Sequence, residues 1–286
     1  MQTLILRLAI VLGCFCAVPA ASGQEPDREY TFGVVPEQSP ARIIRMWAPF
    51  ISQLEKMSGL NIRLVTAPSV TEFHQHVAEG YYDFGYLSAS AFAATEIATV
   101  YHAVARQATS LNGIVVVRED SPFRRIKDLN NTRILFPSEE AFSSSIIPRA
   151  ELHAAGVRFE ISYVDSHDSV YMAVARGLAE AGGGVERTFS SIPRDIRSQL
   201  RVMYRTHPYT SHPFAVSNRV DDEVGQKFTD ALLEIAESPG GKILFNALGI
   251  GNIIEAKNSD WDDVREILEA EKVAEAAAAN AEKETP

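Results

Sequence analysis

Residues 81–95 read YYDFGYLSASAFAAT, and this stretch decides how the chain around it folds. Its first part, residues 82–87, is apolar and aromatic and predicts a short buried strand; the small residues at 88–91 then form a turn that opens a helix. Upstream segments repeat the order of strand and helix, at residues 30–35, 40–57, 61–66 and 69–79. Strands that alternate with helices pair in parallel, so the sequence predicts an α/β lobe.

The same alternation of strands and helices begins again further along the chain, which indicates a second lobe. The expected strands and helices of this part lie at residues 113–117, 132–136, 148–155, 157–164, 169–176 and 199–204. A domain holds about 150 residues, so a chain of 286 residues fits two lobes. Helices are expected again at 220–237, 241–248 and 261–271. The last segment, 271–286, is rich in Ala, Glu and Lys and is expected to be a solvated tail.

The N-terminus has the order of a secretory signal. Arg7 supplies a positive charge, residues 8–17 are apolar, and small residues run up to Gly23. We therefore expect residues 1–23 to be removed on export to the periplasm. A lipoprotein cleavage site at Cys14 is a less favoured alternative, as is a retained N-terminal helix. Cys14 and Cys16 are the two cysteines of the chain, so the exported part would form neither a disulfide nor a thiolate metal site.

The charge of the chain limits its partners. The formal net charge is -10 at pH 7, with 37 acidic and 27 basic residues. Nucleic acids and anionic membranes need clustered Lys and Arg, so neither is an expected partner. A small anion can still bind such a chain where backbone N–H groups and hydroxyls meet locally.

Six blocks of the sequence, taken in order, resemble the phosphate/phosphite/phosphonate-binding proteins of ABC importers. The blocks are FGVVPEQSP (32–40), YYDFGYLSASAFAAT (81–95), ILFPSEEAFSSSIIPRAEL (134–152), SHDSVYMAVARGLAEAGGG (166–184), HPYTSHPFAVS (207–217) and FNALGIGNI (245–253). The resemblance implies a type 2 periplasmic binding-protein fold, in which each of two lobes is a mostly parallel sheet flanked by helices. Two crossing strands would join them near residues 108–117 and 205–216. Lobe 1 would then comprise residues 24–108 and 206–270, and lobe 2 residues 109–205.

The candidate ligand site follows from helix starts and from the resemblance. Helix N-termini favour anions because their first N–H groups are unpaired and the helix dipole is positive there. Two such places are the turn at 88–91 and the Ser-rich segment before the helix at Pro148, which we expect to be a loop, while the resemblance adds an imidazole and a carboxylate. The candidate residues are Ser88, Ser90, Phe92, Phe142, Ser143, Ser144, His167 and Glu186.

Each candidate also has a plain structural interpretation. The serines could be small packing residues or helix caps, His167 a residue of a capping loop, and Glu186 a surface acid. The chain also departs from its relatives, whose hydroxyl donors are replaced here by Val70, Phe92, Ala141 and Phe142. A pocket with fewer donors would be more apolar, so a ligand other than a phosphonate remains open.

The function implied by the resemblance is that of a receptor. It would be a monomer that captures a small anion in the cleft between its lobes, without a cofactor, and delivers it to an ABC permease. A sensing subunit that signals to a membrane protein is the alternative. The sequence has no Gly-x-Ser-x-Gly elbow and no phosphate-binding loop, so we do not expect an enzyme. His74 and His76 are two residues apart on an expected helix and make a poor metal pair, so no metal is expected.

Overall fold

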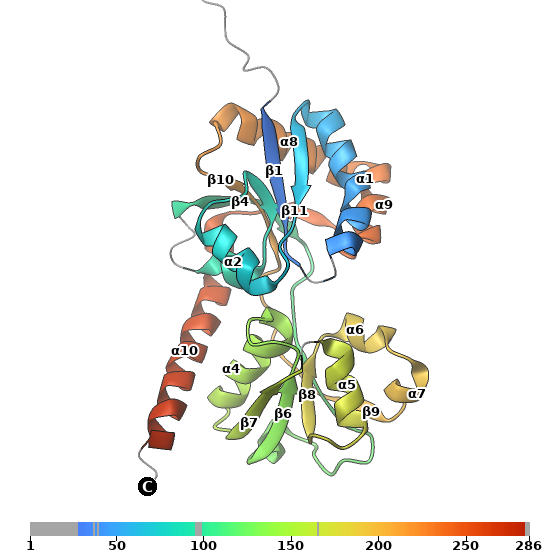
Figure 1. Ribbon diagram of the computed structural model, residues 1–286, viewed down its shortest axis with the longest axis vertical. Coiled ribbons are helices and arrows are strands. Elements are labelled where there is room, and N and C mark those ends of the chain that lie inside the picture. Colours follow the sequence, from blue (N-terminus) through green and yellow to red (C-terminus); the bar gives the residue numbers. More distant parts are fainter. Residues whose placement is uncertain (1–27, 37, 39, 95–98, 165, 284–286) are drawn as a thin grey trace, which may run out of the picture.

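The structure is a computed structural model that describes residues 28–36, 38, 40–94, 99–164 and 166–283. The expected secretory signal at 1–23, with Cys14, lies outside these residues. Figure 1 shows two lobes, each built on one β-sheet with helices on its faces. The prediction of a two-lobed α/β fold is confirmed, but the expectation of mostly parallel sheets is wrong. Among the described strands, each sheet has at least as many antiparallel pairs as parallel ones. In the part of the chain described, no helix is both long and apolar enough to cross a membrane.

Lobe 1 is built on a six-stranded sheet with the strand order β11-β4-β10-β3-β1-β2. Its strands are β1 (Glu29–Val34), β2 (Asn61–Val65), β3 (Phe84–Tyr86), β4 (Tyr101–Gln107), β10 (Pro213–Ser217) and β11 (Ile253–Glu255). β1 pairs in parallel with β2 and β3, whereas β10 runs antiparallel to β3 and β4 and β11 antiparallel to β4. The carboxyl ends of β1 and β3 therefore lie at one edge of the sheet, where the site is built.

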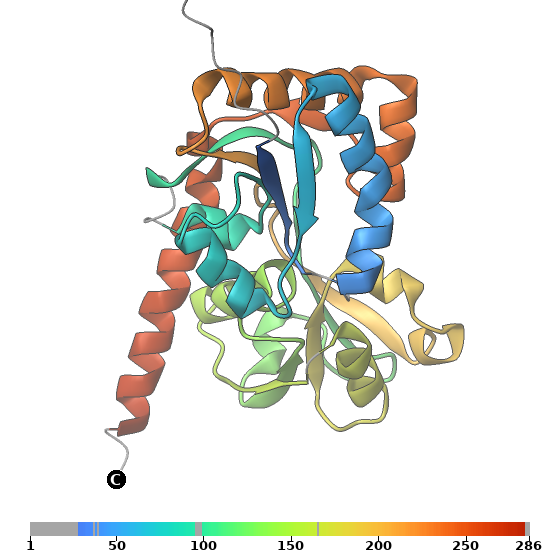
Figure 2. The ribbon, with the colours of Figure 1, turned by 45° about the horizontal axis from the view of Figure 1, so that its top comes forward.

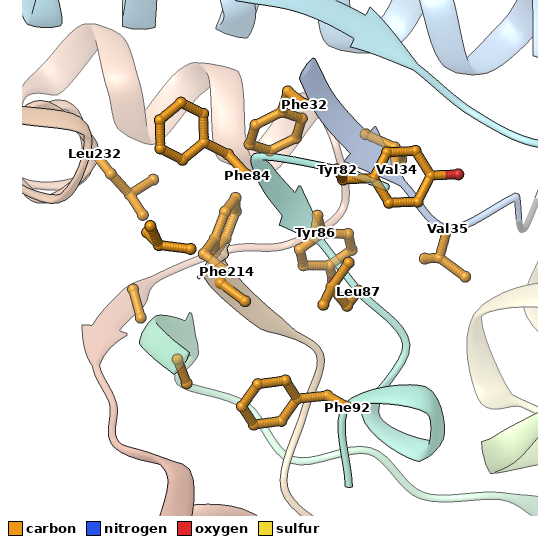
Figure 3. Packing of buried hydrophobic residues seen from close by; sticks show 14 of the residues in the cluster. Phe32, Val34, Val35, Tyr82, Phe84, Tyr86, Leu87, Phe92, Phe214 and Leu232 are labelled. Atoms are coloured by element: carbon orange, nitrogen blue, oxygen red, sulfur yellow. The ribbon is translucent and has the colours of Figure 1, made fainter. Parts of the chain in front are cut away.

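Helices cover both faces of this sheet. The helices of lobe 1 are α1 (Pro40–Ser58), α2 (Val70–Ala78), α3 (Ala89–Ala93), α8 (Asp222–Glu237) and α9 (Pro239–Ala247). α1, α8 and α9 pack against one another, and α2 contacts α3. Figure 3 shows the aromatic core beneath them, in which Phe32 and Phe214 lie 6.5 Å apart between ring centroids. This core fixes β1, β3 and β10 relative to the helices.

Lobe 2 is built on a five-stranded sheet with the order β7-β6-β8-β5-β9. Its elements are β5 (Ile114–Arg118), a 3₁₀ turn (Ile126–Leu129), β6 (Thr132–Phe136), α4 (Ile147–Ala154), β7 (Phe159–Tyr163), α5 (His167–Ala175), β8 (Ala181–Gly184), α6 (Glu186–Ser191), α7 (Arg194–Arg197) and β9 (Leu200–Arg205). A further expectation was wrong: the Ser-rich segment before Pro148 is a π-helix, η3 (Phe142–Ile146), that continues into α4. Its wider turns are closed by bonds such as Ile146 N–H to the Ala141 carbonyl, 3.1 Å.

Two extended segments cross between the lobes. Residues 108–113 join β4 to β5, and residues 206–212 join β9 to β10. The segments pair where Leu111 and Tyr209 exchange two backbone hydrogen bonds of 2.8 Å each. A further hydrogen bond joins the two segments beside this pair, where Gly113 N–H donates to the Thr206 hydroxyl (2.8 Å). The paired segments form the hinge of the molecule.

The C-terminal helix α10 (Asp262–Lys283) also spans both lobes. It follows a 3₁₀ turn (Asn258–Trp261) in lobe 1 and runs beside lobe 2, where it packs on α4 (Figure 2). Glu271 opens the segment that we expected to be solvated, yet it is only 3% exposed. Its carboxylate binds Arg149 Nε at 2.7 Å and His153 Nδ1 at 3.1 Å. The sequence could not show this contact because Arg149 lies 122 residues earlier in the chain.

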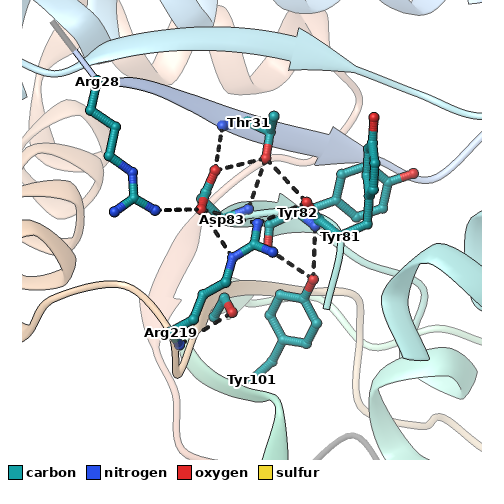
Figure 4. Close-up of polar contacts among 8 residues, drawn as sticks. Arg28, Thr31, Tyr81, Tyr82, Asp83, Tyr101 and Arg219 are labelled. Atoms are coloured by element: carbon teal, nitrogen blue, oxygen red, sulfur yellow. Dashed lines mark hydrogen bonds and ion pairs between the residues drawn. The ribbon is translucent and has the colours of Figure 1, made fainter. Parts of the chain in front are cut away.

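A buried carboxylate holds the opposite edge of the lobe 1 sheet together. Asp83, at the amino end of β3, accepts hydrogen bonds from Thr31 N–H (2.8 Å) and from the Thr31 hydroxyl (2.9 Å), as Figure 4 shows. Arg28 and Arg219 complete the cluster, at 3.4 and 3.0 Å from Asp83 Oδ1. The charge of Asp83 is thus paired and hydrogen-bonded, which buried charge requires. This cluster lies at the end of β3 remote from Ser88 and serves the fold.

Candidate functional site

The lobe 1 side of the site is the turn between β3 and α3. Ser88 is the N-cap of α3, and its hydroxyl accepts a hydrogen bond from Ala91 N–H (3.1 Å). The same hydroxyl lies 2.8 Å from His74 Nε2 and 3.5 Å from the Ser90 hydroxyl. Ala89 N–H donates to His212 Nδ1 at 2.9 Å. Two amides at the start of α3 are therefore already bound by side chains of the protein itself.

The lobe 2 side of the site is the start of the continuous helix formed by η3 and α4. Two glycines let this helix approach the sheet closely: a Cβ on Gly113 would lie 2.1 Å from the Ser143 carbonyl oxygen, and one on Gly183 would lie 2.2 Å from that of Ser144. The first N–H groups of a helix have no acceptor within the helix, and the dipole is positive there. The helix start is thus held firmly and has the character of an anion site.

Hydroxyls and one imidazole surround this helix start. His167, the first residue of α5, lies with Nε2 3.2 Å from the Ser144 hydroxyl and Nδ1 2.8 Å from the Thr188 hydroxyl. Ser145 is fully buried, and its hydroxyl has no hydrogen-bond partner among the described residues. Because hydroxyls rotate and either imidazole nitrogen can donate, this group can present donors to an anion oxygen.

Direct contacts across the lobes close one side of the site. Glu140, which precedes η3 in lobe 2, accepts a hydrogen bond from the Thr71 hydroxyl of α2 at 2.9 Å. The same carboxylate lies 3.9 Å from His74 Nδ1. Burial lowers the pKa of His74 from its ordinary value of 6.5, Glu140 opposes that shift, and His212 adds to it. The neutral form of His74 is therefore favoured near pH 7, and its ring joins Ser88 to the opposite lobe.

The structure brings some of the expected residues together and separates others. Ser88 pairs with Ser90, and Ser144 with His167, as described. Ser143 is half-buried, and its carbonyl lies close to Gly113. Phe92 is instead buried in the lobe 1 core (Figure 3). Its ring packs against that of Trp261, with 4.8 Å between the ring centroids. Phe142 is buried in the same core and lies edge-on to Tyr209.

Glu186 faces solvent on α6 of lobe 2. Its side chain is 51% exposed and pairs with Arg205 at 3.2 Å. This matches the surface interpretation of the residue better than a contact with a ligand.

Two residues of the site were missed by reasoning from the sequence. His74 was considered only as a metal ligand and His212 was not among the candidates, but both bind the start of α3. His212 lies 123 residues after Ala89, and no spacing rule connects the two. The described residues contain no group of three or more His, Cys, Asp or Glu that could hold a metal ion. The two histidines are hydrogen-bonding residues in this structure.

Comparison with known proteins assigns the chain to a family. The family model for the ABC transporter, phosphonate, periplasmic substrate-binding protein matches residues 32–261. The phosphonates-binding periplasmic protein of Escherichia coli (strain K12) is 21% identical over 248 residues, which cover 80% of this chain and 72% of that protein.

Solved structures share the fold. The binding protein component of an ABC phosphonate transporter from Pseudomonas aeruginosa has a TM-score of 0.71 at 15% identity, covering 87% of this chain and 88% of that one. The PhnD1 protein of Prochlorococcus marinus (MIT 9301), solved with methylphosphonate, also has a TM-score of 0.71, at 16% identity and with 84% and 96% covered. The predicted resemblance is therefore confirmed, and the chain belongs to the phosphonate-binding family of periplasmic substrate-binding proteins of ABC transporters.

Proposed function

We propose that this protein is an exported receptor that captures a phosphonate-class anion between its lobes and delivers it to the permease of an ABC importer. The observation that carries the proposal is the helix start at Phe142, which two glycines hold against the hinge and the lobe 2 sheet. Membership of the phosphonate-binding family supports the same class of ligand. The receptor would act as a monomer in the periplasm after loss of residues 1–23.

The chemistry of the site suits a tetrahedral anion. The N–H groups of Phe142, Ser143 and Ser144 open a helix, so they would bind oxygens with the help of the dipole. The Ser144 hydroxyl and His167 add donors beside them. These groups act locally, which explains how a chain with a net charge of -10 can bind an anion.

Closure of the lobes would couple binding to transport. The hinge at Leu111 and Tyr209 allows the lobes to rotate, and contacts such as Thr71 to Glu140 form when they meet. A ligand that touches both lobes stabilises the closed form by its extra contacts there. The permease would recognise the closed pair of lobes.

The test is a binding screen of the chain from residue 24 onward. Melting temperature and calorimetric titration would be measured with phosphate, phosphite, methylphosphonate, 2-aminoethylphosphonate and sulfate. A ligand that binds the folded state raises the melting temperature, so we expect a rise with at least one phosphonate. If none of these anions shifts melting at millimolar concentration, or if one is chemically converted, the proposal is wrong.

Variants locate the anion within the site. We expect the Ser143 hydroxyl, like that of Ser144, to donate to the anion beside the backbone N–H groups. A hydrogen bond to a charged oxygen is worth about 1.5–3 kcal/mol, so Ser143→Ala and Ser144→Ala should each weaken binding by roughly tenfold or more. Ser52→Ala, at an exposed position of α1, is the control and should bind as the wild type does. If both site variants keep wild-type affinity, the anion lies elsewhere.

A further inference from the structure

A cavity of about 110 Å³ lies beside the lobe 1 part of the site, between the carboxyl ends of β1 and β3, helix α1 and the hinge. Much of its described lining is apolar and includes Val35, Met46, Trp47 and Leu111. A single water needs only about 10–15 Å³ of such space. The cavity therefore has room for an organic group of several heavy atoms.

A polar atom in the cavity wall, Gln38 Oε1, is buried and has no hydrogen-bond partner in the described part of the chain. Gln107, also in the wall, differs: its Oε1 accepts from the Tyr86 hydroxyl at 3.3 Å and its Nε2 donates to Thr109 at 2.7 Å. Buried acceptors are normally satisfied, so Gln38 indicates a place for a donor that the ligand supplies.

The cavity is connected to the site by a shared residue. His212 binds Ala89 N–H at the start of α3 through Nδ1, and its ring lies in the cavity wall, edge-on to Tyr86 at 5.4 Å. The wall also includes Arg187, from α6 of lobe 2, so the cavity is bounded by both lobes. A molecule in this cavity would lie between the lobes, against the His212 ring that also binds the start of α3. The positive charge of Arg187 in the wall disfavours a cationic tail there.

We propose that this cavity, the α1 cavity, takes the organic tail of the ligand, and that the ligand is an anion with a short apolar chain ending in a neutral hydrogen-bond donor such as a hydroxyl. The chain packs against Met46, Trp47 and Leu111, and the terminal hydroxyl donates to Gln38 Oε1. The inference rests on the proposed function, because the anionic head has to bind at the helix start in lobe 2.

The test compares three probes by calorimetric titration: methylphosphonate, propylphosphonate and 3-hydroxypropylphosphonate. Burying two further methylene groups should tighten binding by about tenfold from the first probe to the second. The third probe should bind more tightly again, by several-fold, through Gln38. Gln38→Met keeps the length of the side chain without an amide acceptor, so it should bind propylphosphonate as the wild type does and lose the advantage of the hydroxyl.

A second variant fills the cavity. Met46→Trp should leave methylphosphonate affinity unchanged and remove the gain from the longer chains. Met172→Trp makes the same change at a position on α5 that is 38% exposed, and it should behave as the wild type does. Equal affinity of the wild type for methylphosphonate and propylphosphonate would overturn the tail assignment and leave the proposed function standing. Failure of all three probes to bind would overturn the proposed function as well.

Discussion

The contact between α10 and lobe 2 provides a quantitative test of the packing. Arg149 and Glu271 have side chains that are 3% and 5% exposed, and their Nε and Oε1 atoms lie 2.7 Å apart. Arg149 also donates to the Tyr163 hydroxyl at 2.5 Å and to the Glu139 carbonyl at 3.2 Å. Replacing Glu271 by alanine removes a buried anion and leaves the guanidinium in place.

The expected loss follows from the burial of both charges. Removing one partner of a buried ion pair costs about 3–5 kcal/mol, because the remaining charge stays desolvated. Arg149 keeps its bonds to Tyr163 and Glu139, so we expect Glu271→Ala to lower the free energy of unfolding by about 3 kcal/mol, the lower end of that range. For a chain of this size, that loss corresponds to a fall in melting temperature of roughly 6–12 °C.

The assay is equilibrium unfolding in urea, followed by circular dichroism, with a matched control on the same helix. Glu269 is exposed on α10, so Glu269→Ala should unfold close to the wild type. Glu271→Gln keeps the volume of the side chain and an acceptor oxygen without the charge, and it should fall between the two alanine variants. If Glu271→Ala unfolds within about 0.5 kcal/mol of Glu269→Ala, as ordinary surface substitutions do, the reasoning is refuted.

Three other predictions concern the hinge, the Asp83 cluster and His74. Gly113→Ala places a Cβ 2.1 Å from the Ser143 carbonyl, so it should displace η3 and weaken phosphonate binding at least several-fold in a titration, whereas Gly240→Ala, with open space around it, should not. Asp83→Ala leaves Thr31 N–H without its acceptor, so it should lower the free energy of unfolding by about 1–3 kcal/mol in urea melts. Ligand affinity should be unchanged, because the cluster lies at the far end of β3. Burial lowers the pKa of His74 below 6.5, so the unfolded chain takes up that proton first as the pH falls. The wild type should therefore lose stability relative to His74→Gln in urea melts between about pH 7 and about pH 5, and a constant difference would contradict the assignment.

Local pattern was enough to predict the strands and the longer helices. The apolar run before Ser88 forms β3 as expected, because its side chains are buried on both faces of the sheet. The helical spacing in 40–57 likewise matches α1, whose buried face includes Trp47 and Phe50. The conformation of these elements is set by residues that are close in the sequence, so the sequence alone is enough to predict them.

Features that depend on contacts between distant segments were not visible. Three adjacent serines before Pro148 have low helix propensity, and the sequence predicted a loop there. The segment is a π-helix, and Gly113 of the crossing segment and Gly183 of β8 leave space for its carbonyls. In the same way, Phe92 was assigned to the site because the resemblance implies a hydroxyl donor at its position in relatives, and its packing on Trp261 shows that it faces the core.

The position of Gly113 also couples the hinge to the anion site. This residue ends the crossing segment 108–113, exchanges hydrogen bonds with Thr206 of the other crossing segment, and abuts the Ser143 carbonyl. The helix start is therefore built on the hinge itself, and rotation of the lobes would carry it without changing its geometry. Closure of the lobes then changes only which lobe 1 residues, such as Thr71 and His74, lie near this helix start. An anion held by lobe 2 alone would bind equally well in the open and closed forms, so selectivity for closure has to come from groups of lobe 1.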